Sequence, residues 1–142
     1  MHWGRRFVMD KIPDLRAACG DGNSDAEYWY FLWVHHIHLF LGFFYGQSVP
    51  ERAATLIHEC RHGTGGRVYD ANFPRGSAMG EGQPGADSSW TFRGAWMFEA
   101  LYLWWYYADG RNASLPLREH ARQTAQFYFD NCFARHPGFV IH

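Results

Sequence analysis

The spacing of apolar and polar positions changes several times along the chain, and each change marks an expected element. Residues 28–46 carry aromatic and β-branched side chains in short runs, which is typical of two strands or of one long bent strand. The sequence Gly-Asp-Gly-Asn at 20–23 breaks the chain before them. The preceding stretch, from about Asp10 to Ala18, is expected to be helical in part.

The first of three long helices is expected after residue 48. Ser48 can act as its N-cap, with Glu51 three residues later as in a capping box, and Gly63 is a typical stop. The glycine-rich stretch 63–88 is expected to be a loop.

Two further helices are expected in the last third of the chain. One runs from about Trp90 to Ala108 and is strongly aromatic, with a stripe of side chains best interpreted as core. The other follows Ser114 and runs from about Leu115 to Arg135. Three helices with a small sheet predict the α+β class, and 142 residues predict a single domain over 1–142.

Composition narrows the classes of function. Apolar residues make up 47% and aromatic residues 19% of the chain, which excludes an intrinsically disordered protein. A formal net charge of -1 gives no strong field for nucleic acid, so no nucleic-acid partner is expected. Residues 28–49 carry no charged side chain, yet three histidines lie among them, so no membrane span is expected.

Compartment and oligomeric state stay open. The N-terminus has no apolar stretch of the kind found in a signal peptide. Three widely spaced cysteines, at Cys19, Cys60 and Cys132, form neither a disulfide framework nor a zinc ribbon, and the choice between free thiols and a single bridge such as Cys19–Cys132 stays open.

One motif on the first long helix carries chemistry. His58-Glu59-Cys60-Arg61-His62 is an H-E-x-x-H sequence, whose spacing places both imidazoles on one helix face and within reach of one ion. Zn²⁺ accepts two imidazole nitrogens and leaves room for a further ligand and a water. Glu59 is the candidate general base that activates that water.

The stretch around this motif resembles the zincin metallopeptidases, and among them the aspzincins of the deuterolysin and peptidyl-Lys type. Residues 42–44 and then 51–62 (ERAATLIHECRH) are similar to the family's strand and zinc helix. The segment 85–90 (GADSSW) resembles the family's third-ligand segment, with Ala for Thr and Trp for Tyr. The resemblance implies a zinc metallopeptidase acting on a peptide or amide substrate, with Asp87 as third zinc ligand.

The residues leave the third ligand open between several candidates. Asp87 lies at a loop–helix junction, and Glu99 lies in the apolar run of the next helix, an arrangement that resembles the glutamate-type zincins. Asp70 and His120 are weaker alternatives. A second reading of the whole chain is a small, non-catalytic interaction domain with a structural or vestigial metal site.

Two other groups could take part in binding or catalysis. His36 and His38, two residues apart on an expected strand, share one face and could ligate a metal, although histidines so placed are more often hydrogen-bonded within a sheet. Tyr102 and Tyr106 are candidates to donate a hydrogen bond to a tetrahedral oxyanion.

Overall fold

The computed structural model describes residues 2–11, 14–19, 24–31, 34–64 and 69–142. The chain divides into two compact units, Met1–Gly66 and Arg67–His142, and each is described by itself. The predicted α+β class is confirmed, with three main helices, a three-stranded mixed sheet and a two-stranded sheet. Because two compact units can belong to one domain, the single domain over residues 1–142 stays a prediction.

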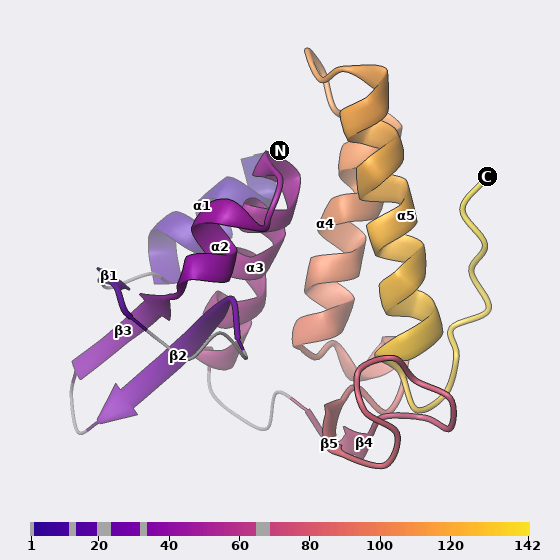
Figure 1. Cartoon of the computed structure of the whole chain (residues 1–142), viewed down its shortest axis with the longest axis horizontal. Helices are drawn as coiled ribbons and strands as arrows, with labels where there is room; N and C mark the ends of the chain where they lie inside the picture. The colour runs from indigo at the N-terminus through magenta and orange to yellow at the C-terminus, as the bar shows by residue number, and fades with distance from the viewer. Residues whose placement is uncertain (1, 12–13, 20–23, 32–33, 65–68) are drawn as a thin grey trace. The chain divides into compact units, whose positions relative to one another are not determined.

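The first unit combines the mixed sheet with three helices (Figure 1). The sheet has the strand order β1-β3-β2, so that β3 is central, parallel to β1 and antiparallel to β2. The elements are α1 (His2–Lys11), β1 (Leu15–Ala17), β2 (Ala26–Phe31), β3 (Val34–Leu39), α2 (Leu41–Tyr45) and α3 (Val49–His62).

Two expectations for this unit were wrong in detail. The helix expected from about Asp10 to Ala18 is instead α1, which ends at Lys11, and Leu15–Ala17 forms β1. The strand region expected over 28–46 ends at Leu39 and is followed by the short helix α2. In β1, pairing with a strand distant in the sequence outweighs the local preference of the residues.

The core of the first unit lies on one face of β3. Ile37 and Leu39 alternate along the strand and are buried together with Phe43 of α2 and Cys60 of α3. Phe7 and Val8 of α1, with Tyr28 of β2 and Leu56 of α3, pack around this cluster. All three helices therefore send apolar side chains to the same face of the sheet.

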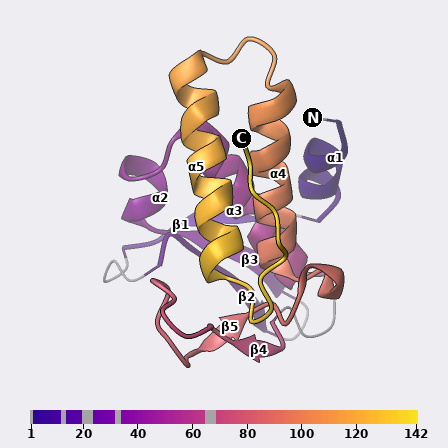
Figure 2. The ribbon, with the colours of Figure 1, turned by 90° about the vertical axis from the view of Figure 1, so that its right-hand side faces the viewer.

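The second unit is built on two long helices that pack side by side (Figures 1 and 2). Its elements are β4 (Ala71–Asn72), β5 (Pro84–Ala86), the 3-10 turn η1 (Trp90–Phe92), α4 (Ala95–Asp109) and α5 (Leu115–Asn131). Helix α4 begins later than the expected Trp90, because the short turn η1 ends in a left-handed Arg93 (φ 59°). Helix α5 begins as expected at Leu115 and ends at Asn131.

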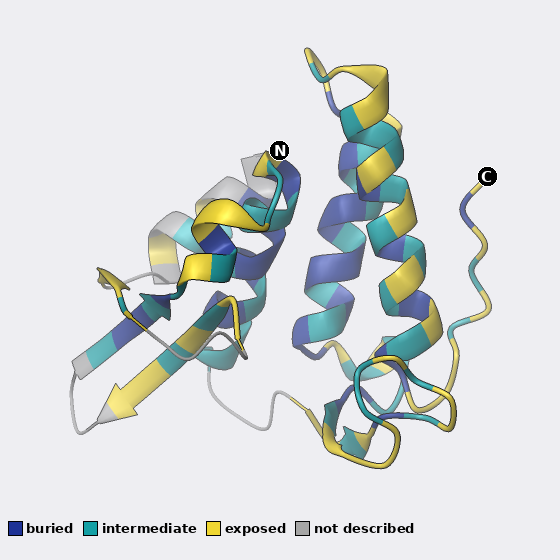
Figure 3. Cartoon of the chain, viewed as in Figure 1, coloured by how far each residue is buried: buried dark blue, intermediate teal, exposed yellow. Residues whose placement is uncertain are grey.

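Aromatic side chains fill the core of this unit. Figure 3 shows buried residues along much of the length of α4. Tyr102 and Tyr106 are buried, which confirms the core interpretation of the aromatic stripe on this helix. Trp90 and Trp104 form edge-on contacts with Phe129, and both contact Phe139 of the C-terminal segment.

The structure also bears on the expected absence of a membrane span and on the state of the cysteines. Among the residues described, no helix combines the length and the apolar character needed to cross a membrane. All three cysteines are free thiols, Cys19 exposed and the other two buried.

Replacement of Ile37 by Ala should destabilise the first unit strongly. The side chain is fully buried, and deleting its methyl and methylene groups leaves a cavity that costs about 2–5 kcal/mol in the free energy of unfolding. Leu41→Ala, at a position 55% exposed in the same unit, is the control and should cost about 0.5 kcal/mol or less. Urea unfolding measures both, and equal losses would contradict the assigned core.

Candidate metal centre

Helix α3 is fixed at both ends by signals present in the sequence. At its start the carboxylate of Glu51 accepts a hydrogen bond from the backbone N–H of Ser48 at 2.7 Å, one half of the predicted capping box. At its end the backbone N–H of Gly63 donates to the carbonyl of Glu59 at 3.3 Å. The motif 58–62 therefore occupies the last turns of a well-delimited helix.

The rotation of α3 about its axis is set by its buried side. Cys60 is fully buried against Ile37 and Leu39 of β3. His58 and His62 lie two residues to either side of Cys60, which at 100° per residue places both about 160–200° around the helix from it. The two imidazoles therefore project from the side of α3 opposite to the sheet.

His58, Glu59 and His62 form a group that could hold a metal ion. One ligand atom from each residue lies within 4.8 Å of the others, and the two imidazole centroids are 4.9 Å apart. Both histidines are partly buried, and Glu59 is buried at 7% exposure. Two imidazoles and a carboxylate are a donor set that suits Zn²⁺ better than Mg²⁺ or Ca²⁺, which prefer oxygen ligands.

The surroundings of His62 keep its imidazole neutral. Burial, with smaller contributions from the neighbouring His58 and Arg61, lowers the pKa of His62 from 6.5 to about 3. Arg61 is held at the helix end, where its guanidinium donates to the hydroxyl of Thr64. A neutral imidazole is the form that binds a metal, so His62 is ready to do so near neutral pH.

A hydroxyl–imidazole pair near this helix end was not foreseen from the sequence. The Tyr28 hydroxyl is 2.6 Å from Nδ1 of His35, and the Tyr28 ring lies against the Cα of Gly63. A Cβ at Gly63 would come within 2.7 Å of that ring, so glycine is required there by close approach. Only the register of β2 on β3 brings these residues together, and a motif search carries no signal for it.

Asp87, the expected third ligand, belongs to the second unit and is fully buried there. Its carboxylate accepts a hydrogen bond from the backbone N–H of Met97 at 3.0 Å, in the first turn of α4. The N-cap of α4 is Gly94, which has no side chain of its own, and a Cβ at Gly94 would collide with the Asp87 carboxylate. Asp87 thus stabilises the start of α4 from a distance in the sequence.

The alternative ligands also lie in the second unit. Glu99 is buried at 4% exposure on α4, and with Asp87 it contributes to raising the pKa of the buried Cys132 thiol, which burial raises most. Asp70 is exposed and accepts a hydrogen bond from the backbone N–H of Ser88 at 2.7 Å. His120 is exposed on α5.

The tyrosines proposed as oxyanion donors are core residues of α4. Tyr102 and Tyr106 are 8% and 7% exposed, and burial raises the pKa of Tyr102, with a smaller contribution from Tyr106. The expectation that either donates to an oxyanion stays a prediction.

Comparison with known proteins does not assign the chain to a family. No protein-family model, curated protein or solved structure matches this chain. What is shown is a His58–Glu59–His62 group with H-E-x-x-H spacing that could hold a metal ion. The resemblance to aspzincins beyond this group, and with it Asp87 as a ligand, stays a prediction.

The metal-free protein should lose stability as the pH falls. The unfolded chain binds a proton on His62 near pH 6.5, whereas the folded chain binds it only near pH 3. The contribution of the neutral His62 to the free energy of unfolding is therefore fully present above pH 6.5 and is lost as the pH falls from 6.5 to about 3. His62→Gln should reduce this pH dependence. Chemical denaturation in the presence of EDTA at several pH values measures it, and an unchanged slope in the variant would contradict the buried neutral imidazole.

Proposed function

We propose that this protein is a zinc-dependent hydrolase of the metallopeptidase type, in which His58 and His62 hold zinc and Glu59 activates water. The observation that carries the proposal is the convergence of two imidazoles and one carboxylate at the end of α3, within 4.8 Å of one another. In the proposal the carboxylate of Glu59 is not a zinc ligand but lies directly beside the two imidazoles, where a general base is needed.

Each residue of the group has a distinct role in the proposal. A zinc ion held by the two histidines would lower the pKa of water and polarise a substrate carbonyl. Glu59 takes the proton released by the attacking water and returns it to the leaving amine, as a general base and then a general acid. The position of Glu59 supports this role, because its carboxylate lies within 4.8 Å of the ligand atoms of both histidines, close to where a zinc-bound water would be.

The third zinc ligand is proposed to be Asp87, with Glu99 as the alternative. Asp87 is a fully buried carboxylate at the start of α4, where it accepts a hydrogen bond from the Met97 amide, and a carboxylate oxygen is a common zinc ligand. Glu99 is a carboxylate buried at 4% exposure on α4. The substrate is proposed to be a peptide or another amide.

Replacement of Glu59 by Gln should abolish hydrolysis while leaving zinc bound. Gln has the same shape but accepts no proton at neutral pH, so the loss is expected to be about 100-fold or more. His58→Ala should lose the metal itself. Metal analysis of the purified proteins and turnover of a quenched fluorescent peptide library measure the two effects, and full turnover in the Glu59 variant would refute the mechanism.

A substrate-free control separates the hydrolase from a closed structural site. Acetohydroxamate binds a metal only where a coordination position is open, and it should change the visible spectrum of the cobalt-substituted Glu59→Gln protein. An unchanged spectrum would favour the non-catalytic interaction domain.

Asp87→Asn and Glu99→Gln should separate the two candidate ligands. If Asp87 is the ligand, its variant should bind zinc at least about tenfold more weakly, and the Glu99 variant should bind like wild type. Calorimetric zinc titration provides the affinities, and circular dichroism shows that both variants are folded. The reverse result would assign the role to Glu99 and refute Asp87.

A further inference from the structure

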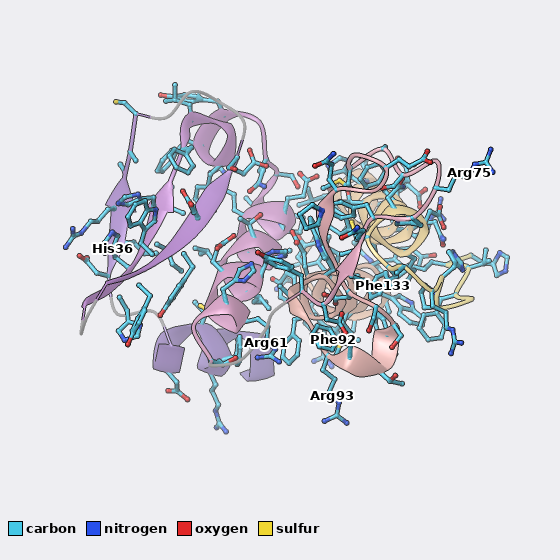
Figure 4. All side chains as sticks on the ribbon, turned by 90° about the horizontal axis from the view of Figure 1, so that it is seen from below. His36, Arg61, Arg75, Phe92, Arg93 and Phe133 are labelled. Atoms are coloured by element: carbon cyan, nitrogen blue, oxygen red, sulfur yellow. The ribbon has the colours of Figure 1, made fainter. Side chains whose placement is uncertain are left out.

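The strand β3 carries a second pair of histidines, on the face of the sheet that the core does not use. Ile37 and Leu39 point into the core with Cys60, so His36 and His38, which alternate with them, project to the opposite face. Figure 4 shows His36 on the sheet, well apart from Arg61 at the end of α3. The two histidine pairs of the first unit are therefore separate groups.

The spacing of the β3 pair matches that expected for two ligands of one ion. The ring centroids of His36 and His38 are 4.6 Å apart, against 4.9 Å for His58 and His62. Two imidazoles on a tetrahedral zinc, with Zn–N about 2.0–2.1 Å, place their centroids roughly 5 Å apart. Because β3 is hydrogen-bonded to a strand on each side, the backbone positions from which the two rings project are held in place.

His36 is buried with an unused nitrogen. Its side chain is 9% exposed, and its Nδ1 has no hydrogen-bond partner among the described residues. Buried polar atoms normally have a partner, so an imidazole nitrogen in this state points to a ligand.

Neighbouring strands place a carboxylate and an aromatic ring on the same face of the sheet as the pair. Glu27 of β2 is in register with His38. Trp29, in register with His36, holds its ring nearly parallel to the imidazole, with an interplanar angle of 8° and a centroid distance of 6.4 Å. Arg16 lies on β1, on the other side of β3 from Trp29. It forms an ion pair with Asp14 at 2.9 Å, which offsets the positive charge of its guanidinium.

We propose that His36 and His38 chelate a divalent transition-metal ion on this face of the sheet. Two imidazoles suit zinc, nickel or copper. The inference does not depend on the hydrolase proposal, because it uses none of the residues of α3.

Zinc stoichiometry of the full-length chain tests the proposal. After removal of metal with EDTA, calorimetric titration with Zn²⁺ should show one equivalent that is lost in His36→Gln/His38→Gln and kept in His58→Gln/His62→Gln. His35→Gln is the matched control, since it changes a histidine on the same strand but on the opposite face, and it should keep that equivalent. A β3 double variant that binds as much zinc as wild type would overturn the proposal.

A single variant and a local fluorescence measurement separate loss of the metal site from misfolding of the double variant. His38→Gln alone changes only a partly buried residue and should by itself remove the same equivalent. Ni²⁺ bound at this pair should quench Trp29, whose ring centroid is 5.6 Å from that of His38, so Trp29→Phe should lose the quenching but not the binding. If Ni²⁺ still quenches tryptophan fluorescence in both His38→Gln and Trp29→Phe, the ion binds elsewhere and the site is refuted. Loss of binding only in the α3 variants would refute it as well.

Discussion

The packing of Cys60 on Ile37 and Leu39 is the contact on which the candidate metal centre depends. It fixes the rotation of α3, and with it the direction in which both imidazoles of the motif project. The same contact fixes the register of β3, because a slip of one residue would exchange Ile37 for a histidine in the core. The cluster thus separates adjacent positions of the strand, with Ile37 and Leu39 on one face of the sheet and His36 and His38 on the other.

The parts of this fold that sequence could predict are those with local causes. Helix α3 was expected from Ser48, Glu51 and Gly63, and it begins and ends at those positions because capping acts within one turn. The strand Leu15–Ala17 was missed because three residues carry almost no local signal, and only parallel pairing with β3 makes them a strand. The start of α4 was placed too early because the left-handed Arg93 that ends η1 has no sequence signature.

The same division applies to the candidate site. The spacing of His58 and His62 is a property of one helix, so their proximity could be predicted and is confirmed. A third ligand depends on contacts between distant segments, and sequence can only rank carboxylates for it. Asp87 illustrates the difficulty, since a carboxylate before a helix is expected both of a ligand and of a residue that stabilises the helix start. Its contact with the Met97 amide establishes the second of these roles.

The strand order β1-β3-β2 has a consequence for how the first unit is made. The central strand is the last of the three to be synthesised, and both outer strands hydrogen-bond to it alone within the sheet. A nascent chain that has emerged from the ribosome only as far as Phe31 therefore lacks the strand with which β1 and β2 pair. The sheet, and the apolar face on which α3 packs, can form only after Leu39 has emerged.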